Sequence, residues 1–336
     1  MRFSDKLIFS FINLCIYIKY VRIVIKFKKR VGYYPDVASP KKYHELMFWR
    51  KVFDHNPLFA VFCDKIATKS YVRTILPEAL LPETLWVGDD ITQIPEELRK
   101  SNAVLKGNHG SSFNHFGEIE SADCARLKAA TMEWLKTDYG RSKHEWGYFK
   151  ARKLLFLEER LVVPEGEDLI DVSIRCSNGK AILASACTGN KTDAKRFGYY
   201  DLAGKRCVSF EIKDPEEGKL PANFSLPASF PLVVDYARRL SVGVDYARFD
   251  FLCVGDRVYP GEITVYPGGG LTSCDDEGID AVIVNGWDIT SSWFLQTPQT
   301  GWRNVYARAV RRHFECRRKA RGTGPVHGAW CACSEA

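Results

Sequence analysis

Charged and hydroxyl side chains alternate with apolar ones along two neighbouring stretches in the last third of the chain. The stretches read Ala247-Arg-Phe-Asp-Phe-Leu-Cys-Val and Val258-Tyr-Pro-Gly-Glu-Ile-Thr-Val, and Gly-Asp-Arg separates them. Alternate side chains of a strand point to opposite faces, so this pattern predicts a hairpin over residues 246–266 with one apolar and one polar face. Side chains able to bind metal or phosphate share the polar face: Arg248, Asp250, Glu262 and Thr264.

The register of this hairpin decides its chemistry. A three-residue loop at 255–257 pairs Val254 with Val258 and places Asp250 opposite Glu262. Two opposed carboxylates repel unless a cation lies between them, and Mg²⁺ is usually held by one or two carboxylates plus phosphates. A polar surface without metal, with an Arg–Glu pair across the strands, is the structural alternative. A two-residue loop would break the alignment.

A second candidate motif lies earlier in the chain. Residues 103–106 predict a buried strand that leads into Gly107-Asn-His-Gly-Ser-Ser. Backbone N–H groups of such a loop can bind phosphates, with Lys106 supplying positive charge. The lysine precedes the glycines, so this is not a Walker loop. An ordinary turn formed by Asn108 and His109 explains the residues equally well.

The elements around these motifs interleave strand and helix patterns. A chain of 336 residues with 46% apolar side chains can bury a large core, which excludes a mostly disordered chain and a multi-span membrane protein. Interleaved strands and helices indicate an α+β or α/β fold. The predicted strands, besides the hairpin, cover 84–87, 103–106, 153–158, 169–176 and 180–187, and the predicted helices cover 122–138 and 230–241.

Charge and cysteine content indicate the setting. Residues 1–30 and 303–322 each carry a net charge of +7, whereas residues 31–302 carry −6, so we expect no nucleic-acid partner for the body. Eleven cysteines lack the paired spacing of a disulfide framework or a zinc site. We therefore expect a reducing compartment, with the protein cytoplasmic or peripheral on the inner face of the cell membrane.

The N-terminal segment combines an apolar run with basic residues. Residues 7–18 hold no charge, but the run is too short to span a bilayer, and the charges follow it, unlike those of a signal peptide. One interpretation is an amphipathic helix within residues 7–30 on a membrane surface, with an apolar face inserted: Phe9, Phe11, Ile12 and Ile16. The alternative is a helix packed on the body.

In combination, the motifs resemble the ATP-grasp superfamily, and within it the TupA-like branch, over roughly residues 40–290. The matching segments are, in order, Asp54-His-Asn-Pro-Leu-Phe, Asp64-Lys65, Val104 to Ser112, Phe156-Leu-Glu-Glu-Arg-Leu161, Asp171 to Gly179, Tyr199-Tyr-Asp201 and Arg248 to Pro267. The resemblance implies an ATP-grasp fold, in which two α+β subdomains hold ATP between them.

The same resemblance assigns roles to individual residues. It implies that Lys65 and Lys106 bind the nucleotide and that a loop closes over its phosphates, formed by Gly107, Gly110, Ser111 and Ser112. It places the adenine against Glu158 and the backbone of Glu159 and Leu161, and the ribose against Asp171. It assigns Mg²⁺ to Asp250, Glu262 and Thr264, and the catalytic roles to Arg248 and Lys106.

Two residues depart from the branch. Asp171-Val172-Ser173 stands where Asp-Tyr-Lys is common, so a lysine is missing near the nucleotide or the acceptor. Ser112 replaces a second loop glycine, which predicts a stiffer lid. Neither change removes a metal ligand.

The expected organisation has five parts. These are a basic amphipathic helix over 1–30, an N-terminal segment over 31–100, a lid subdomain over 101–157, a core subdomain with the metal-binding hairpin over 158–300, and a basic tail over 301–336.

The resemblance implies an ATP-dependent carboxylate–amine ligase that works through an acyl phosphate. Its expected substrates are ATP with Mg²⁺, an amino acid, and a carboxylate-bearing cell-surface polysaccharide or glycopeptide. Three alternatives stay open: an ATP-dependent phosphotransferase on a glycan, a glycosyltransferase of polysaccharide biosynthesis, and a non-catalytic scaffold that uses its basic ends.

Overall fold

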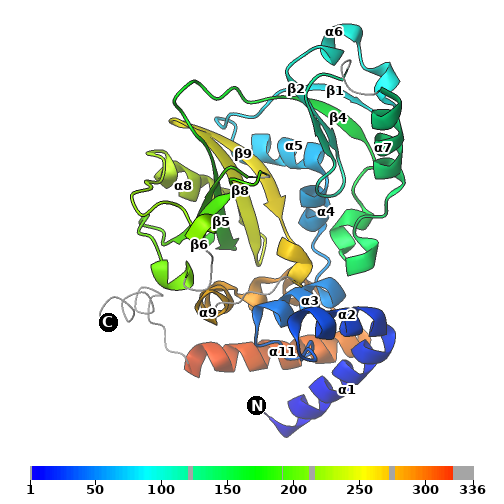
Figure 1. The fold of residues 1–336 in the computed structure, drawn as a ribbon. Helices are drawn as coiled ribbons and strands as arrows, with labels where there is room; N and C mark the ends of the chain where they lie inside the picture. The colour runs from blue at the N-terminus through cyan, green and yellow to red at the C-terminus, as the bar shows by residue number, and fades with distance from the viewer. Residues whose placement is uncertain (1, 120–123, 191, 212–215, 272–276, 321–336) are drawn as a thin grey trace.

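The strands of the protein form two separate antiparallel sheets with helices around them (Figure 1). This computed structural model describes residues 2–119, 124–190, 192–211, 216–271 and 277–320. The first sheet has the order β1-β4-β2-β3, with β1 (Thr84–Gly88), β2 (Ala103–Gly107), β3 (Asn114–Phe116) and β4 (Leu155–Glu159). The second has the order β7-β6-β5-β8-β9, with β5 (Leu169–Ser177), β6 (Lys180–Thr188), β7 (Arg196–Tyr200), β8 (Ala247–Val254) and β9 (Arg257–Thr264). The predicted mixed fold of helices and strands is confirmed.

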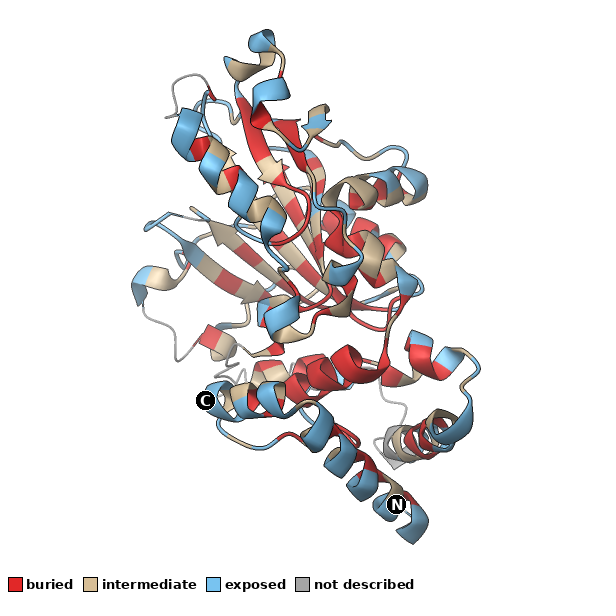
Figure 2. Cartoon of the chain, turned by 90° about the vertical axis from the view of Figure 1, so that its right-hand side faces the viewer, coloured by how far each residue is buried: buried red, intermediate tan, exposed pale blue. Residues whose placement is uncertain are grey.

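Helices cover one face of each sheet and form a layer at the base. The helices are α1 (Phe3–Lys19), α2 (Val21–Val31), α3 (Tyr43–Phe53), α4 (Pro57–Cys63), α5 (Lys65–Ile75), α6 (Glu96–Arg99), α7 (Cys124–Lys136), α8 (Phe230–Leu240), α9 (Glu277–Gly286), α10 (Trp293–Gln296) and α11 (Gly301–Ala320). Helix α7 packs on the first sheet, and α4, α5 and α8 share the core of the second. The base layer contains α1, α2, α3 and α11, and α3 is buried along its whole length (Figure 2).

The predicted strands agree with the observed ones because their side chains alternate between core and surface. Along β5, Val172, Ile174 and Cys176 are fully buried, whereas the residues between them are half-buried. The turn after β5 uses Asn178 and Gly179, both at positive φ (43° and 81°), which is the backbone that a two-residue hairpin turn requires.

Two predicted segments differ from the observed ones. Strand β1 pairs with β4, so the first sheet begins at residue 84, before the predicted lid subdomain of 101–157, whose bounds stay a prediction. Residues 301–320 form helix α11 rather than a tail, because its apolar side chains Tyr306, Ala309 and Val310 complete the base core. The rest of the predicted tail, residues 321–336, lies outside the described part of the chain.

The N-terminal segment forms two helices, α1 and α2, which meet at an angle of 98°. Three of the residues predicted to enter a membrane, Phe9, Ile12 and Ile16, are instead buried in the base core, whereas Phe11 is 64% exposed. For these three residues the alternative interpretation, a helix packed on the body, is therefore confirmed. Among the described helices, none is by itself long and apolar enough to cross a bilayer, and α1 with α2 meets that criterion only as a bent pair.

A buried arginine joins the base layer to the second sheet. Arg50 of α3 is fully buried and donates to Asp245 Oδ1 and to the carbonyl of Val265, both at 2.7 Å. Trp287 donates to the other oxygen of Asp245 at 2.7 Å, and the guanidinium lies 4.5 Å from the Trp287 ring. Asp245 precedes β8 and Val265 follows β9, so Arg50 holds the two open ends of the β8–β9 hairpin.

We predict that Arg50→Met destabilises the protein by roughly 3–5 kcal/mol, because it leaves the Asp245 carboxylate buried without its charge partner. Denaturant unfolding measures the loss. Arg239→Met is the matched control, since Arg239 pairs with Glu78 at the surface and the side chains are 40% and 46% exposed. Equal losses of stability in the two variants would show that the buried ion pair stabilises the protein no more than the exposed pair does.

Candidate active site

The β8–β9 hairpin turns through two residues rather than the predicted three. Val254 pairs with Arg257, so Gly255 and Asp256 form the turn. The register then shifts between Phe249 and Phe251, because β9 has one extra residue opposite Asp250. This β-bulge restores the alignment that the two-residue turn would otherwise break.

Beyond the bulge the pairing is the predicted one. Arg248 lies opposite Thr264, while Asp250 faces the bulge formed by Gly261 and Glu262 instead of pairing directly with Glu262. Arg248, Asp250, Glu262 and Thr264 are all half-buried, and the alternate residues Phe249, Phe251 and Ile263 are in the core. The four polar side chains therefore share one face, as the sequence predicts.

Arg248 neutralises Asp250 on this face. Its Nε and Nη2 atoms donate to the two carboxylate oxygens, each at 2.7 Å. Ser173 Oγ donates to Oδ1 at 2.7 Å, and Thr264 Oγ1 donates to Oδ2 at 3.3 Å. The charge of Asp250, with a smaller contribution from Glu262, raises the pKa of Arg248. The predicted repulsion between the two carboxylates is thus relieved by an arginine.

The donor atoms of this face suit a hard divalent cation. Asp250, Glu262 and Thr264 present oxygen atoms from two adjacent strands. Within the described ranges, no group of three or more His, Cys, Asp or Glu side chains could hold a metal ion. A Mg²⁺ ion at this face would need further oxygen ligands, such as the phosphates of a nucleotide, and the metal role predicted for Asp250, Glu262 and Thr264 stays a prediction.

A second set of charges lies on the first sheet. Glu158 of β4 has a side chain that is only 8% exposed, and its carboxylate accepts from Lys106 of β2. The other carboxylate oxygen lies 2.5 Å from Nζ of Lys69, on α5. Burial lowers the pKa of Lys69, and the charge of Glu158 opposes that shift. One carboxylate thus joins two lysines from different elements.

The sequence interpretation chose Lys65 as the second nucleotide lysine and did not consider Lys69. The Lys65 ammonium instead binds the carbonyl of Gly110, and its backbone N–H donates to Asn108 at 3.2 Å, so this residue supports the loop. Residues four apart share a helix face, so the spacing of Lys65 and Lys69 in the sequence indicates that Lys69 is also a candidate. The role predicted for Lys65 stays a prediction.

The predicted phosphate loop is held by buried residues at its start and is exposed to solvent further along. Asn108 and His109 are buried: Asn108 donates to the Arg152 carbonyl at 2.9 Å, and His109 Nε2 lies 3.0 Å from the Trp134 carbonyl. Ser111 and Ser112 are exposed. Ser112 has a φ of 66°, the left-handed backbone for which the family pattern has glycine. The loop conformation is therefore glycine-like even with serine present.

Tyr139 connects this loop with the hairpin. A Cβ added to Gly110 would lie 2.8 Å from the Tyr139 ring, so the loop packs closely against it. Burial raises the pKa of Tyr139, and the charges of Glu145 and Glu262 raise it further. The Tyr139 ring also lies 4.8 Å from that of Tyr148, which lies 6.5 Å from that of Tyr266, two residues after β9, so three aromatic rings lead from the loop to the end of the hairpin.

Strand β5 contributes an arginine that the sequence interpretation missed. Arg175 lies directly opposite Arg248 in the β5–β8 pairing, and Asp171 and Ser173 precede it on the same face. Its Nη1 donates weakly to Ser185 Oγ at 3.4 Å. Ser173, where the branch commonly has lysine, binds Asp250 instead. Arg175 thus places a positive charge on this face two residues after Ser173, the position at which the branch commonly has lysine.

The residues predicted to bind the base lie where the two sheets connect. Glu159 ends β4 and its backbone N–H donates to the Glu83 carbonyl at 2.9 Å, and Leu161 follows in the segment that leads to β5. Asp171 is half-buried on β5. Their adenine and ribose roles stay predictions.

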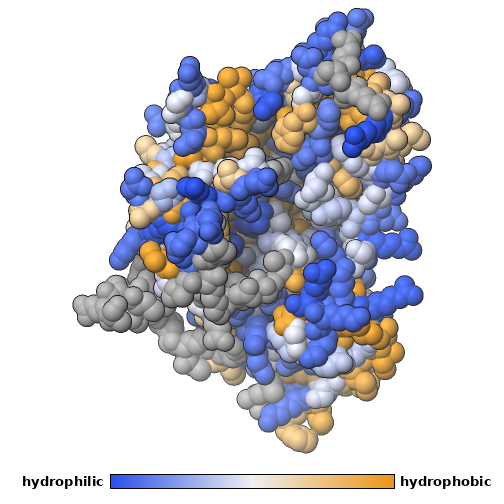
Figure 3. Space-filling model, in the orientation of Figure 1, coloured by the Kyte–Doolittle hydropathy of each residue, from blue (hydrophilic) through white to orange (hydrophobic). Residues whose placement is uncertain are grey.

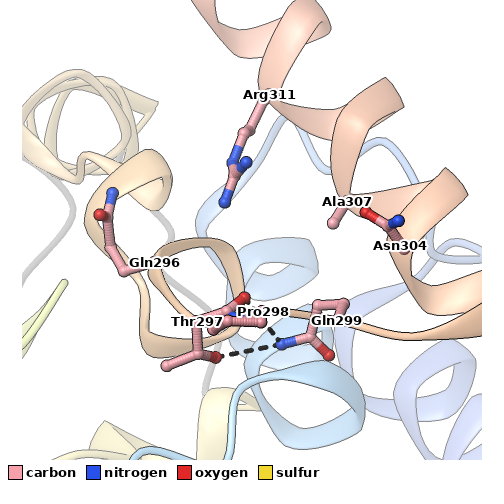
Figure 4. Close-up of a pocket in the computed structure, with 7 residues that line it drawn as sticks. All are labelled: Gln296, Thr297, Pro298, Gln299, Asn304, Ala307 and Arg311. Carbon is pink, nitrogen blue, oxygen red and sulfur yellow. Dashed lines mark hydrogen bonds between the residues drawn. The ribbon is translucent and has the colours of Figure 1, made fainter.

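A separate hollow of about 400 Å³ lies between the 296–299 segment and α11 (Figure 4). It contains none of the predicted site residues. Gln299 Nε2 donates to the carbonyl and the hydroxyl oxygen of Thr297, and Arg311 donates to the Leu295 carbonyl. The lining residues are Gln296, Thr297, Pro298, Gln299, Asn304, Ala307 and Arg311.

Comparison with known proteins gives one family match. Residues 45–285 match the model of the TupA-like ATP-grasp family. No curated protein matches the chain.

Several solved structures resemble the chain at low sequence identity, and three of them are described as ligases. D-alanine–D-alanine ligase from Helicobacter pylori is 17% identical with a TM-score of 0.42, and the match covers 68% of this chain and 62% of that ligase. The corresponding enzyme from Bacillus anthracis, complexed with ATP, is 14% identical with a TM-score of 0.40, covering 76% and 68%. The ATP-grasp ligase PsnB, complexed with a precursor variant, Mg and ADP, is 14% identical with a TM-score of 0.37, covering 81% and 67%.

We predict that Lys69→Gln and Lys106→Gln each weaken ATP binding by roughly ten- to a hundredfold, because each removes a charge-assisted hydrogen bond. Lys65→Gln should have a smaller effect, since its ammonium holds the Gly110 carbonyl. Isothermal titration with ATP and Mg²⁺ measures all three variants. A larger loss for Lys65→Gln than for Lys69→Gln would support the assignment of Lys65 made from the sequence.

Proposed function

The chain belongs to the TupA-like ATP-grasp family, and we propose that it is an ATP-dependent carboxylate–amine ligase. In the proposed reaction, a substrate carboxylate attacks the γ-phosphorus of ATP, and ADP leaves. The resulting acyl phosphate is attacked by an amine, which forms an amide as phosphate leaves and the amine releases its proton. The observation that carries the proposal is the polar hairpin face, on which Arg248, Asp250, Glu262 and Thr264 lie together.

The charged residues have complementary tasks in this scheme. Lys69 and Lys106 bind phosphate oxygens, and Arg248 binds the phosphoryl group in transfer, because a guanidinium can hold two oxygens at once. Asp250, Glu262 and Thr264 would hold Mg²⁺, which when bound neutralises phosphate charge. Phosphate and metal then replace the partners that these side chains have in this structure.

Two arginines on the face support an anionic acceptor. Arg248 is paired with Asp250, whereas the contact of Arg175 with Ser185 is long and uncharged. Arg175 therefore offers a planar donor for a substrate carboxylate beside the phosphoryl-binding arginine. In line with the TupA-like resemblance, we propose a uronic acid of a cell-surface polysaccharide, or a glycopeptide carboxylate, as acceptor and an amino acid as amine donor.

We predict that the wild-type protein, with ATP, Mg²⁺, amino acids and uronic-acid acceptors, produces ADP and inorganic phosphate only when acceptor is present. ³¹P NMR follows the products. Asp250→Asn should lower turnover at least roughly a hundredfold, because it weakens both the metal site and the anchor of Arg248. Asp256→Asn is the matched control, since Asp256 lies exposed in the turn of the same hairpin.

Other products would contradict the ligase. A new phosphoester resonance would identify a phosphotransferase. Consumption of a sugar nucleotide without ATP turnover would identify a glycosyltransferase. Absence of ATP binding in a thermal-shift measurement would favour a scaffold.

We predict that Arg175→Gln raises the KM for the carboxylate substrate by roughly ten- to a hundredfold, through loss of a charged hydrogen bond, and leaves the KM for ATP nearly unchanged. Steady-state kinetics with each substrate varied in turn gives both values. Lys180→Gln, which changes an exposed cation beyond the end of the same strand, is the control. A parallel rise in the KM for ATP would place Arg175 at the nucleotide instead.

A further inference from the structure

Helix α1 is apolar on two opposite faces. Its inner face holds Phe9, Ile12 and Ile16 in the base core, where the Phe9 ring lies 6.1 Å from that of Tyr306. Its outer face carries five large apolar side chains, three or four residues apart, which we call the outer stripe: Phe3 (77% exposed), Leu7 (57%), Phe11 (64%), Leu14 (56%) and Ile18 (71%). This spacing places all five on one side of the helix.

The fold itself does not need the outer stripe. The inner face already packs α1 on the body, so polar side chains on the outer face would serve a water-facing helix better. Exposed apolar residues continue into α2 with Val21 (49%) and Ile25 (46%). In Figure 3 hydrophobic residues gather at the lower right edge, where α1 and α2 lie in Figure 1. A group of exposed apolar side chains of this kind marks a contact site.

The charges around the outer stripe have one sign. Exposed basic residues flank it on both helices: Arg2, Lys6, Lys19, Arg22, Lys28, Lys29 and Arg30. The single acidic residue of segment 1–30, Asp5, is 2% exposed, and its carboxylate binds Arg312 at 2.5 Å. The described surface of residues 2–30 therefore presents apolar and cationic groups without an anionic side chain.

We propose that the outer stripe and its basic flank dock the protein on an anionic membrane surface. The apolar side chains enter the boundary between headgroups and acyl chains, and the cations contact lipid phosphates. A second copy of this surface would bring two sets of like charges together, whereas an anionic bilayer offers negative charge around an apolar interior. Docking uses no residue of the proposed ligase site, so it is independent of that proposal.

Vesicle co-sedimentation of the full chain tests this inference. The wild-type protein should bind phosphatidylcholine vesicles that contain phosphatidylglycerol, and should bind less at high salt because the attraction is screened. The triple variant Phe11→Ser/Leu14→Ser/Ile18→Ser should lower the partition coefficient at least about tenfold, through lost apolar burial. A triple Leu80→Ser/Val162→Ser/Val208→Ser is the matched control, since these side chains are 46%, 68% and 64% exposed elsewhere.

A charge variant supplies an independent readout. Arg22→Gln/Lys29→Gln/Arg30→Gln should weaken binding roughly fivefold per charge removed, without changing the outer stripe. Failure of the wild-type protein to bind vesicles with phosphatidylglycerol would overturn the proposal, as would an equal loss in the matched control. A dimer in light scattering that the stripe variant converts to a monomer, without vesicle binding by either protein, would show that a second copy covers this surface.

Discussion

The geometry of the site depends on one buried guanidinium. Arg50 binds the Asp245 carboxylate at the start of one hairpin strand and the Val265 carbonyl at the end of the other, so it fixes both open ends of β8–β9. Removing a charge from water is costly, and it is offset here by the carboxylate, the carbonyl and the flanking Trp287 ring. The polar face can therefore be rigid although its own residues are half-exposed, because the constraint lies beneath it in the core.

Within the site, the charged groups neutralise one another. Arg248 holds Asp250 on the second sheet, and Glu158 lies between Lys69 and Lys106 on the first. Arg248, Lys69 and Lys106 are cations of the kind that binds phosphate, and each is held by a carboxylate. Asp250 is also of the kind that binds metal. In this structure each of these partly buried charges therefore has a partner of opposite sign, which offsets the cost of removing it from water.

The base layer positions both the outer stripe and the candidate active site. Helix α3 supplies Arg50 and is buried throughout, and α1 packs on this layer through its inner face. Helix α1, which carries the outer stripe, lies on the side of the base layer away from the two sheets (Figure 1).

The sequence by itself determined most of the strands, though not β3 and β7, and the alternation of core and polar faces along the hairpin, because side-chain alternation is a local property of a strand. It also determined the family, since the motifs keep their order along the chain. Tertiary structure decided what depends on distant partners. The bulge beside Asp250 restored a register that the turn alone would have shifted, and the position of α5 against β4 selected Lys69 for Glu158. The contact of α1 with α11 buried Phe9 and left Phe11 outside, because a helix with two apolar faces does not reveal in its own sequence which face meets the core.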